Sequence, residues 1–135
     1  MKVSNFIEEE EEIIIRDAFE ETIEFCEEVQ EKTNDGDLEK RIKDVIEHTK
    51  ESEEILFNGE DNALKPFQRV RGIEYKIAQA QKEAKNSLRT LEQIDLSEQR
   101  NNPVESIRTA YNEIRAVLNR AHERVEQEFG YGDSS

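Results

Sequence analysis

The spacing of apolar residues near the C-terminal end constrains the fold of this chain more than any other feature. Between residues 102 and 130 these residues recur three and four positions apart, at Val104, Ile107, Tyr111, Ile114, Leu118, Ala121 and Val125. This period places them on one stripe of an α-helix that packs lengthwise against other helices. Asn102 and Glu105 fit a capping box, and Gly130 suits a C-terminal cap. We therefore predict a helix over about 103–129.

Three earlier segments carry stripes of the same period. The expected helices cover about residues 5–33, 37–57 and 63–94. Short runs of turn-forming residues form the first two links between these helices. Connections this short join antiparallel neighbours. We therefore predict an all-α, elongated, antiparallel up-down four-helix bundle. It forms a single domain over residues 1–130, followed by a flexible C-terminal tail over 131–135.

Details of these stripes predict how the helices begin and pack. Asn5 and Glu8 fit a capping box for the first helix. The second stripe contains Thr49 and Ser52, whose hydroxyls need hydrogen-bond partners if they are buried. Gly72 lies inside the third helix, where it indicates either a close contact or a kink. The third stripe is expected to comprise Phe67, Val70, Ile73, Ile77, Ala80, Ala84, Leu88, Leu91 and Ile94.

The charge of the chain is concentrated in its first half. Residues 1–62 contain 22 acidic and 7 basic side chains, giving −15, whereas residues 63–135 contain 11 and 12, giving +1. Direct binding of nucleic acid by the acidic half is not expected, because phosphate contacts need clustered cations. The third helix is richer in Lys and Arg, so it is a natural neighbour for an acidic helix, within the molecule or in a partner. The candidate partner-binding residues on the first helix are Glu20, Glu24, Glu27, Glu28 and Glu31.

The cellular setting is inferred from cysteine content and hydropathy. Cys26 is the only cysteine, and its place on an apolar stripe predicts a buried small hydrophobe rather than a nucleophile. Five consecutive glutamates, residues 8–12, interrupt the early apolar run, so we expect neither a signal peptide nor a membrane span. A cytoplasmic location without membrane contact is the resulting expectation.

The sequence predicts no metal site and no cofactor. A di-iron bundle uses Glu three residues before His on two helices, but Val45 and Asn119 occupy those positions before His48 and His122. The Asp- and Gly-containing turn near Gly36 does not fit a calcium loop, whose last position requires a bidentate Glu. No glycine-rich phosphate loop is present either.

One segment of the fourth helix resembles a family motif. Arg115 to His122 reads Arg-Ala-Val-Leu-Asn-Arg-Ala-His, which is similar to the Arg-to-His pattern of HEPN ribonucleases, small helical proteins that act as dimers. The resemblance implies that Arg115 orients a phosphate and that His122 assists attack by a ribose 2′-hydroxyl. It covers eight residues, and Ala116 replaces the Asn that commonly follows the Arg.

These observations leave several classes of function open. The first is a non-enzymatic interaction module, an inhibitor or adaptor whose acidic helix binds a basic surface of a protein partner, or a nucleic-acid mimic. The second is a HEPN-like ribonuclease that uses Arg115 and His122. The third is a homo-oligomeric structural or scaffold protein that pairs through its first and fourth helices.

Overall fold

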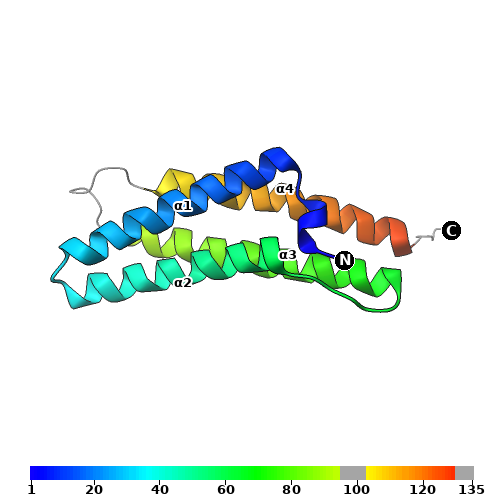
Figure 1. Cartoon of the computed structure of the whole chain (residues 1–135), viewed down its shortest axis with the longest axis horizontal. Helices are drawn as coiled ribbons and strands as arrows, with labels where there is room; N and C mark the ends of the chain where they lie inside the picture. Colours follow the sequence, from blue (N-terminus) through cyan, green and yellow to red (C-terminus); the bar gives the residue numbers. More distant parts are fainter. Residues whose placement is uncertain (95–102, 130–135) are drawn as a thin grey trace.

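Four long α-helices follow one another in the computed structural model, which describes residues 1–94 and 103–129 (Figure 1). They are α1 (Glu9–Lys32), α2 (Gly36–Asn58), α3 (Pro66–Glu92) and α4 (Val104–Phe129), preceded by the short 3-10 helix η1 (Val3–Phe6). Helices α1 and α3 each pack against both α2 and α4. The predicted antiparallel four-helix bundle is therefore confirmed, and α1 and α3 occupy diagonal corners of it.

The start of α1 differs from the prediction. The capping box forms one turn later than expected, with Glu8 as the capping residue, and its backbone N–H donates to Glu11 Oε1 at 2.8 Å. Asn5 lies instead in η1, between the buried side chains of Val3 and Phe6. These two apolar residues belong to the core, where η1 packs against α2, α3 and α4. This packing takes residues 3–6 out of the axis of α1.

The other helix ends agree closely with the sequence. Asp35 caps α2 by accepting from the backbone N–H groups of Asp37 and Leu38, at 3.0 and 3.3 Å. Helix α3 begins at Pro66, three residues later than expected, because proline suits the first helical turn. The expected caps at Asn102 and Gly130, and the expected tail over 131–135, lie outside the described residues.

The stripes that the sequence indicates for the first two helices are buried except for Leu38, which is half-buried, whereas those of α3 and α4 are partly shifted. The members of the first two stripes are Ile15, Ala18, Phe19, Thr22, Cys26 and Val29 in α1, and Leu38, Ile42, Val45, Thr49, Ser52 and Leu56 in α2. Ala110 and Val117 are fully buried in α4, and Tyr111 and Leu118 are only half-buried. In α3, Ser87 is fully buried and Leu88 is half-buried. The largest fully buried side chains are those of Ile15, Phe19, Ile42, Leu56, Ile73, Ile77, Leu91, Ile107 and Ile114. Ala80, Ala84, Ala110 and Ala121 are also fully buried, so small side chains occupy several central positions.

The predicted need of the buried hydroxyls for partners is met between α2 and α3. Ser52 Oγ donates to the carbonyl of Ala80 at 2.7 Å, and Ser87 Oγ donates to the carbonyl of Val45 at 3.2 Å. Thr49 Oγ1 lies 2.9 Å from Ser87 Oγ. Because a serine hydroxyl has one hydrogen, Thr49 must donate to Ser87 when Ser87 donates to Val45. This hydroxyl layer fixes the register of α2 against α3.

Gly72 is a site of close approach. A Cβ atom at this position would lie 2.0 Å from Oδ2 of Asp61, in the connection between α2 and α3. Asp61 Oδ1 accepts from the backbone N–H of Ala63 at 2.9 Å, so the aspartate is held in place. The glycine therefore accommodates the connecting segment rather than another helix.

None of the helices in the described part of the chain is long and apolar enough to cross a membrane.

Candidate functional site

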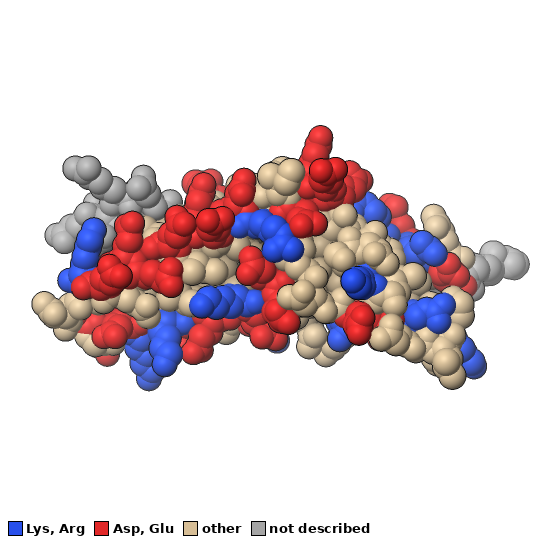
Figure 2. Space-filling model, in the orientation of Figure 1, with Lys and Arg blue, Asp and Glu red and all other residues tan. Residues whose placement is uncertain are grey.

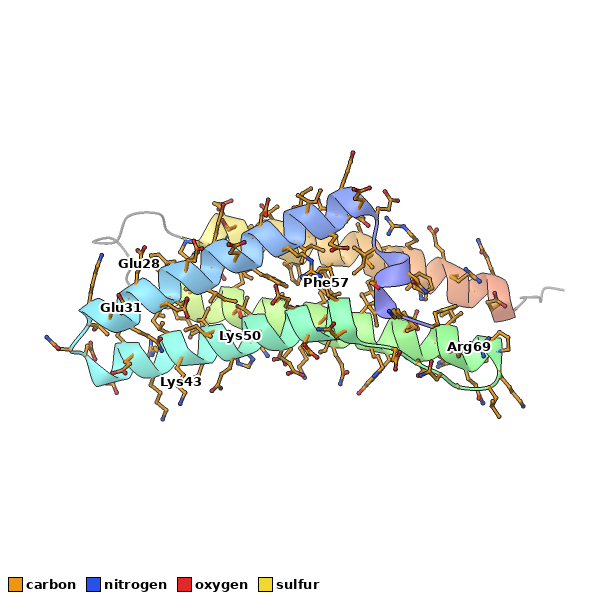
Figure 3. All side chains as sticks on the ribbon, viewed as in Figure 1. Glu28, Glu31, Lys43, Lys50, Phe57 and Arg69 are labelled. Atoms are coloured by element: carbon orange, nitrogen blue, oxygen red, sulfur yellow. The ribbon has the colours of Figure 1, made fainter. Side chains whose placement is uncertain are left out.

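The five glutamates predicted to bind a partner form one exposed surface along α1, called here the acidic surface. Its members are Glu20, Glu24, Glu27, Glu28 and Glu31, and all five are exposed. Figure 2 shows Asp and Glu gathered over α1. Figure 3, in the same view, shows Glu28 on α1 toward the upper side of the molecule and Lys43 on α2 toward the lower side. Within residues 1–94 and 103–129, none of the five forms an ion pair.

The topology explains why this charge is not neutralised inside the molecule. Helix α1 carries eleven acidic and two basic residues, giving −9, whereas α3 carries three acidic and six basic residues, giving +3. The most acidic and the most basic helix lie at diagonal corners and do not pack side by side. The cation Arg16 of α1 is engaged elsewhere, because it pairs with Glu12 at 2.9 Å and lies 3.9 Å from the ring centre of Phe57.

The second predicted site, Arg115 and His122, is not assembled as a pair. The two residues are seven positions apart on α4, which places them about 10.5 Å apart along the helix axis. His122 contacts two carboxylates instead: its Nδ1 lies 2.8 Å from Glu74 Oε2 on α3, and its Nε2 lies 3.1 Å from Glu126 Oε1. Arg115 is exposed and forms no ion pair with a described residue.

The two carboxylates determine the protonation of His122. The hydrogen bond with Glu74 raises the pKa of His122 above its ordinary value, and the charge of Glu126 raises it further. A higher pKa increases the fraction of His122 in the imidazolium form, which can donate a proton but cannot accept one. This arrangement suits a general acid and disfavours the general base that 2′-hydroxyl attack requires.

A shallow groove beside His122 runs between α3 and α4. Tyr75, Asn119 and His122 are among its lining residues, and Tyr75 is 66% exposed. Arg115 is not among them. The groove therefore places His122 near an aromatic ring and an amide, but it does not bring in the second residue of the predicted ribonuclease pair.

The remaining titratable groups have structural surroundings. The thiol of Cys26 is fully buried, and burial, together with the charge of Glu27, raises its pKa to about 12. It is therefore a protonated core side chain at neutral pH, as predicted. His48 Nδ1 lies 2.7 Å from Glu83 Oε2 across the α2–α3 interface. In the described part of the chain, no three His, Cys, Asp or Glu side chains converge in a way that could hold a metal ion.

Sequence reasoning missed the contacts made by the histidines. The spacing of four between His122 and Glu126 can be read from the sequence, since such pairs face each other on a helix. The Glu74 and Glu83 contacts join different helices, so they depend on the register between helices and have no local signal. Tyr75 was also missed, because an aromatic residue outside the apolar stripe has no predictable neighbour.

Searches against protein-family models, curated proteins and solved structures find no match to this chain.

Proposed function

We propose that this protein is a non-enzymatic interaction module whose acidic surface on α1 binds a basic surface of a protein partner, as an adaptor or inhibitor does. The observation that carries the proposal is a row of five exposed glutamates that have no ion-pair partner among the described residues. A row of like charges without ion-pair partners is an electrostatic cost that a cationic partner relieves.

The rigid helix beneath the acidic surface supports specific recognition. Phe19, Cys26 and Val29 bury the opposite side of α1, so the glutamates are carried on a fixed helix rather than on a mobile loop. Each exposed pair with a Lys or Arg contributes only about 0.2–1 kcal/mol, so affinity comes from several pairs together. Such contacts speed association and weaken at high salt.

A matched pair of charge variants tests the proposal. The first variant replaces the five glutamates of the acidic surface with Gln. The control replaces five other glutamates, all exposed and all outside α1, with Gln: Glu39, Glu47, Glu51, Glu54 and Glu60. Removing five negative charges takes the net charge from −14 to −9 in both proteins, so the two differ only in where charge is lost.

Immobilised wild type and both variants are incubated with extract of the source cell at about 0.1 and 0.5 M salt, where the Debye length is about 10 Å and about 4 Å. We expect a basic partner to be retained by the wild type and the control at low salt, released at high salt, and lost from the first variant. Equal retention by all three proteins would refute the role of the acidic surface. If DNA displaces the partner, the nucleic-acid mimic is the form that applies.

The ribonuclease alternative stays a prediction, which rests on the resemblance of the segment from Arg115 to His122 to the HEPN motif. RNA cleavage that disappears in His122→Ala would establish it, and a wild type inert toward RNA would remove it. The contacts of His122 with Glu74 and Glu126 favour the interaction module over this alternative.

A further inference from the structure

The outer side of α3 carries a regular line of mostly basic side chains. The line is spaced 4-3-4-3-4, which places its members on one face of the helix, and we call it the basic seam. Its members are Arg71, Tyr75, Ala78, Lys82, Lys85 and Arg89. All are exposed except Ala78, which is half-buried. The seam thus combines four cations with a short apolar stretch near the start of the helix.

The acidic residues of α3 do not neutralise this seam. All three are engaged by other helices: Glu74 by His122 at 2.8 Å, Glu83 by His48 at 2.7 Å, and Glu92 by Arg108 at 3.0 Å. By contrast, Lys82, Lys85 and Arg89 form no ion pair with a residue in the described ranges. These contacts turn the three acidic side chains of α3 toward α2 and α4 and leave the cations of the seam on its outer side.

The outer side of α1 carries a line of the same period and opposite charge. We call it the acidic seam, and it overlaps the acidic surface defined above. Its members are spaced 3-4-3-4-3-4 and all are exposed: Glu10, Ile13, Asp17, Glu20, Glu24, Glu27 and Glu31. Its one apolar member, Ile13, is 54% exposed. The basic seam spans 18 residues, or about 27 Å, and the part of the acidic seam from Glu10 to Glu27 spans 17 residues, or about 26 Å.

The two seams match position by position when α1 and α3 are laid parallel. Advancing along the chain by 61 or 62 residues takes each member of the acidic seam up to Glu27 onto a member of the basic seam. The apolar residues Ile13 and Tyr75 then face each other. The other matches are Glu10 with Arg71, Asp17 with Ala78, Glu20 with Lys82, Glu24 with Lys85, and Glu27 with Arg89. No like charges meet anywhere along this alignment.

We propose that the acidic seam of one molecule binds the basic seam of a second copy of the same chain. The proposal rests on the interaction-module function and names its partner. In the up-down bundle α1 and α3 run in the same direction, so a sideways translation of one copy brings the seams together in parallel. A second copy also supplies an isoleucine and a tyrosine at matching heights, which an arbitrary basic surface does not.

The position of the seams determines the kind of assembly. Because α1 and α3 lie at diagonal corners, a copy that has bound through its α1 still presents its α3 on the far side. The contact is therefore heterologous, and rows of copies form rather than closed two-fold dimers. The net charge of −14 opposes this association. At 0.15 M salt the Debye length is about 8 Å, so charges facing each other across the contact outweigh those on distant helices.

Charge reversal on each seam tests the pairing. One variant carries Glu20→Lys, Glu24→Lys and Glu27→Lys, and a second carries Lys82→Glu, Lys85→Glu and Arg89→Glu. A third protein carries all six substitutions. All six positions are exposed, and circular dichroism checks that each protein keeps its helix content. Sedimentation velocity at 0.15 M salt is measured over a hundredfold range of protein concentration.

We expect the sedimentation coefficient of the wild type to rise with concentration and this rise to vanish at 0.5 M salt. Each variant with three substitutions should associate at least tenfold more weakly than the wild type. Association should return in the protein with all six substitutions, because opposite charges then face each other again. It should return for the same reason in an equimolar mixture of the two variants with three substitutions.

A wild type that stays monomeric throughout would overturn the self-pairing. So would either variant with three substitutions if it associated as strongly as the wild type. The proposed function is decided separately, by the partner capture with the five-glutamine variant. A monomeric wild type that still captures a basic partner through the acidic surface would refute only the second copy as that partner.

Discussion

Arg120 of α4 ties the start of the chain to the bundle, and its replacement by Met tests that contact. Its guanidinium donates to both carboxylate oxygens of Glu11, each at 2.9 Å, and to the carbonyl of Phe6 at 2.6 Å. It also lies 3.3 Å from Glu8 Oε1. Glu11 is only 8% exposed, so it depends on this one cation. Met keeps the apolar stem of Arg and removes only the charge and the donors.

The expected loss follows from the burial of the two partners. Removing one member of a buried ion pair costs about 3–5 kcal/mol, because the other charge is left without compensation. The Arg120 side chain is 36% exposed, so solvent screens part of this loss. Glu11 also keeps the backbone N–H of Glu8 as a donor. We therefore expect Arg120→Met to lower the free energy of unfolding by about 2–3 kcal/mol at pH 7, which lowers Tm by about 6–12 °C in a domain of this size.

The loss should depend on pH. Burial acts to raise the pKa of Glu11, but the hydrogen bonds from Arg120 and from the Glu8 N–H, together with the charge of Arg120, hold this pKa below its ordinary value of 4.5. In the wild type, Glu11 therefore contributes stability above about pH 4.5, and this contribution is lost as pH falls through the lowered value. Without Arg120, burial dominates and the folded-state pKa rises. The carboxylate then protonates more easily, and the cost of Arg120→Met should be smaller at pH 4 than at pH 7.

Urea unfolding followed by circular dichroism at pH 7 and pH 4 measures these differences. In a Glu11→Gln background, Arg120→Met should cost less than about 1 kcal/mol, since no buried charge is then left unpaired. Arg124→Met removes an exposed pair with Glu128 and serves as the control, with an expected cost below about 0.5 kcal/mol. The reasoning is wrong if Arg120→Met costs no more than Arg124→Met at pH 7, or if Glu11→Gln leaves its cost unchanged.

Three further predictions concern single sites. Gly72→Ala should destabilise the wild type, because the new Cβ meets Asp61 Oδ2 at 2.0 Å, but should stabilise an Asp61→Ala background by about 1 kcal/mol through helix propensity; urea unfolding of the four proteins reads the change of sign. His122 should titrate above its ordinary pKa of 6.5 by NMR, and Glu74→Gln should lower that pKa; an unchanged titration would contradict the contact. Cys26, with a pKa of about 12 and no exposed surface, should react with a thiol reagent at pH 8 only when denaturant is added.

The bundle could be predicted because its information is local. Apolar residues three and four positions apart fix a helix and its buried side, and turn residues fix where that helix ends. Asp35 and Pro66 are examples, since a capping carboxylate and a first-turn proline act within their own helix. The start of α1 was predicted wrongly, because Asn5 and Glu8 also satisfy the local rule. The choice depends on Val3 and Phe6, which bury themselves against residues far along the chain.

The exact buried line of α3 and α4 could not be predicted for a similar reason. On α4 the apolar band is wider than one stripe, and the period alone does not tell which side of the band faces the centre. The structure buries Ala110 and Val117 and leaves Tyr111 and Leu118 at the edge. Small side chains at the centre permit close helix contact, and longer side chains cover the boundaries between neighbouring helices. That distribution is set by the neighbouring helices.

The candidate site divides in the same way. The exposure of the acidic surface could be predicted from α1 alone, because its glutamates lie opposite the apolar stripe. The surroundings of His122 could be predicted only in part: Glu126 lies one turn away on the same helix, whereas Glu74 is brought in by α3. Arg115 and His122 share a helix, so a motif search finds them together, but the groove beside His122 is built from other residues.

The charge asymmetry of the molecule follows from its short connections rather than from any single contact. In a ring of four helices joined in sequence by short links, the first and third helices always lie diagonally, whichever way the ring turns. The hydroxyl layer of Thr49, Ser52 and Ser87 adds to this, because its hydrogen bonds are satisfied only when α2 lies beside α3 in one register. Acidic α1 therefore cannot reach basic α3 within the chain, and the two opposite charges remain on opposite sides. A partner that satisfies both sides must itself carry both, as a second copy of this chain does.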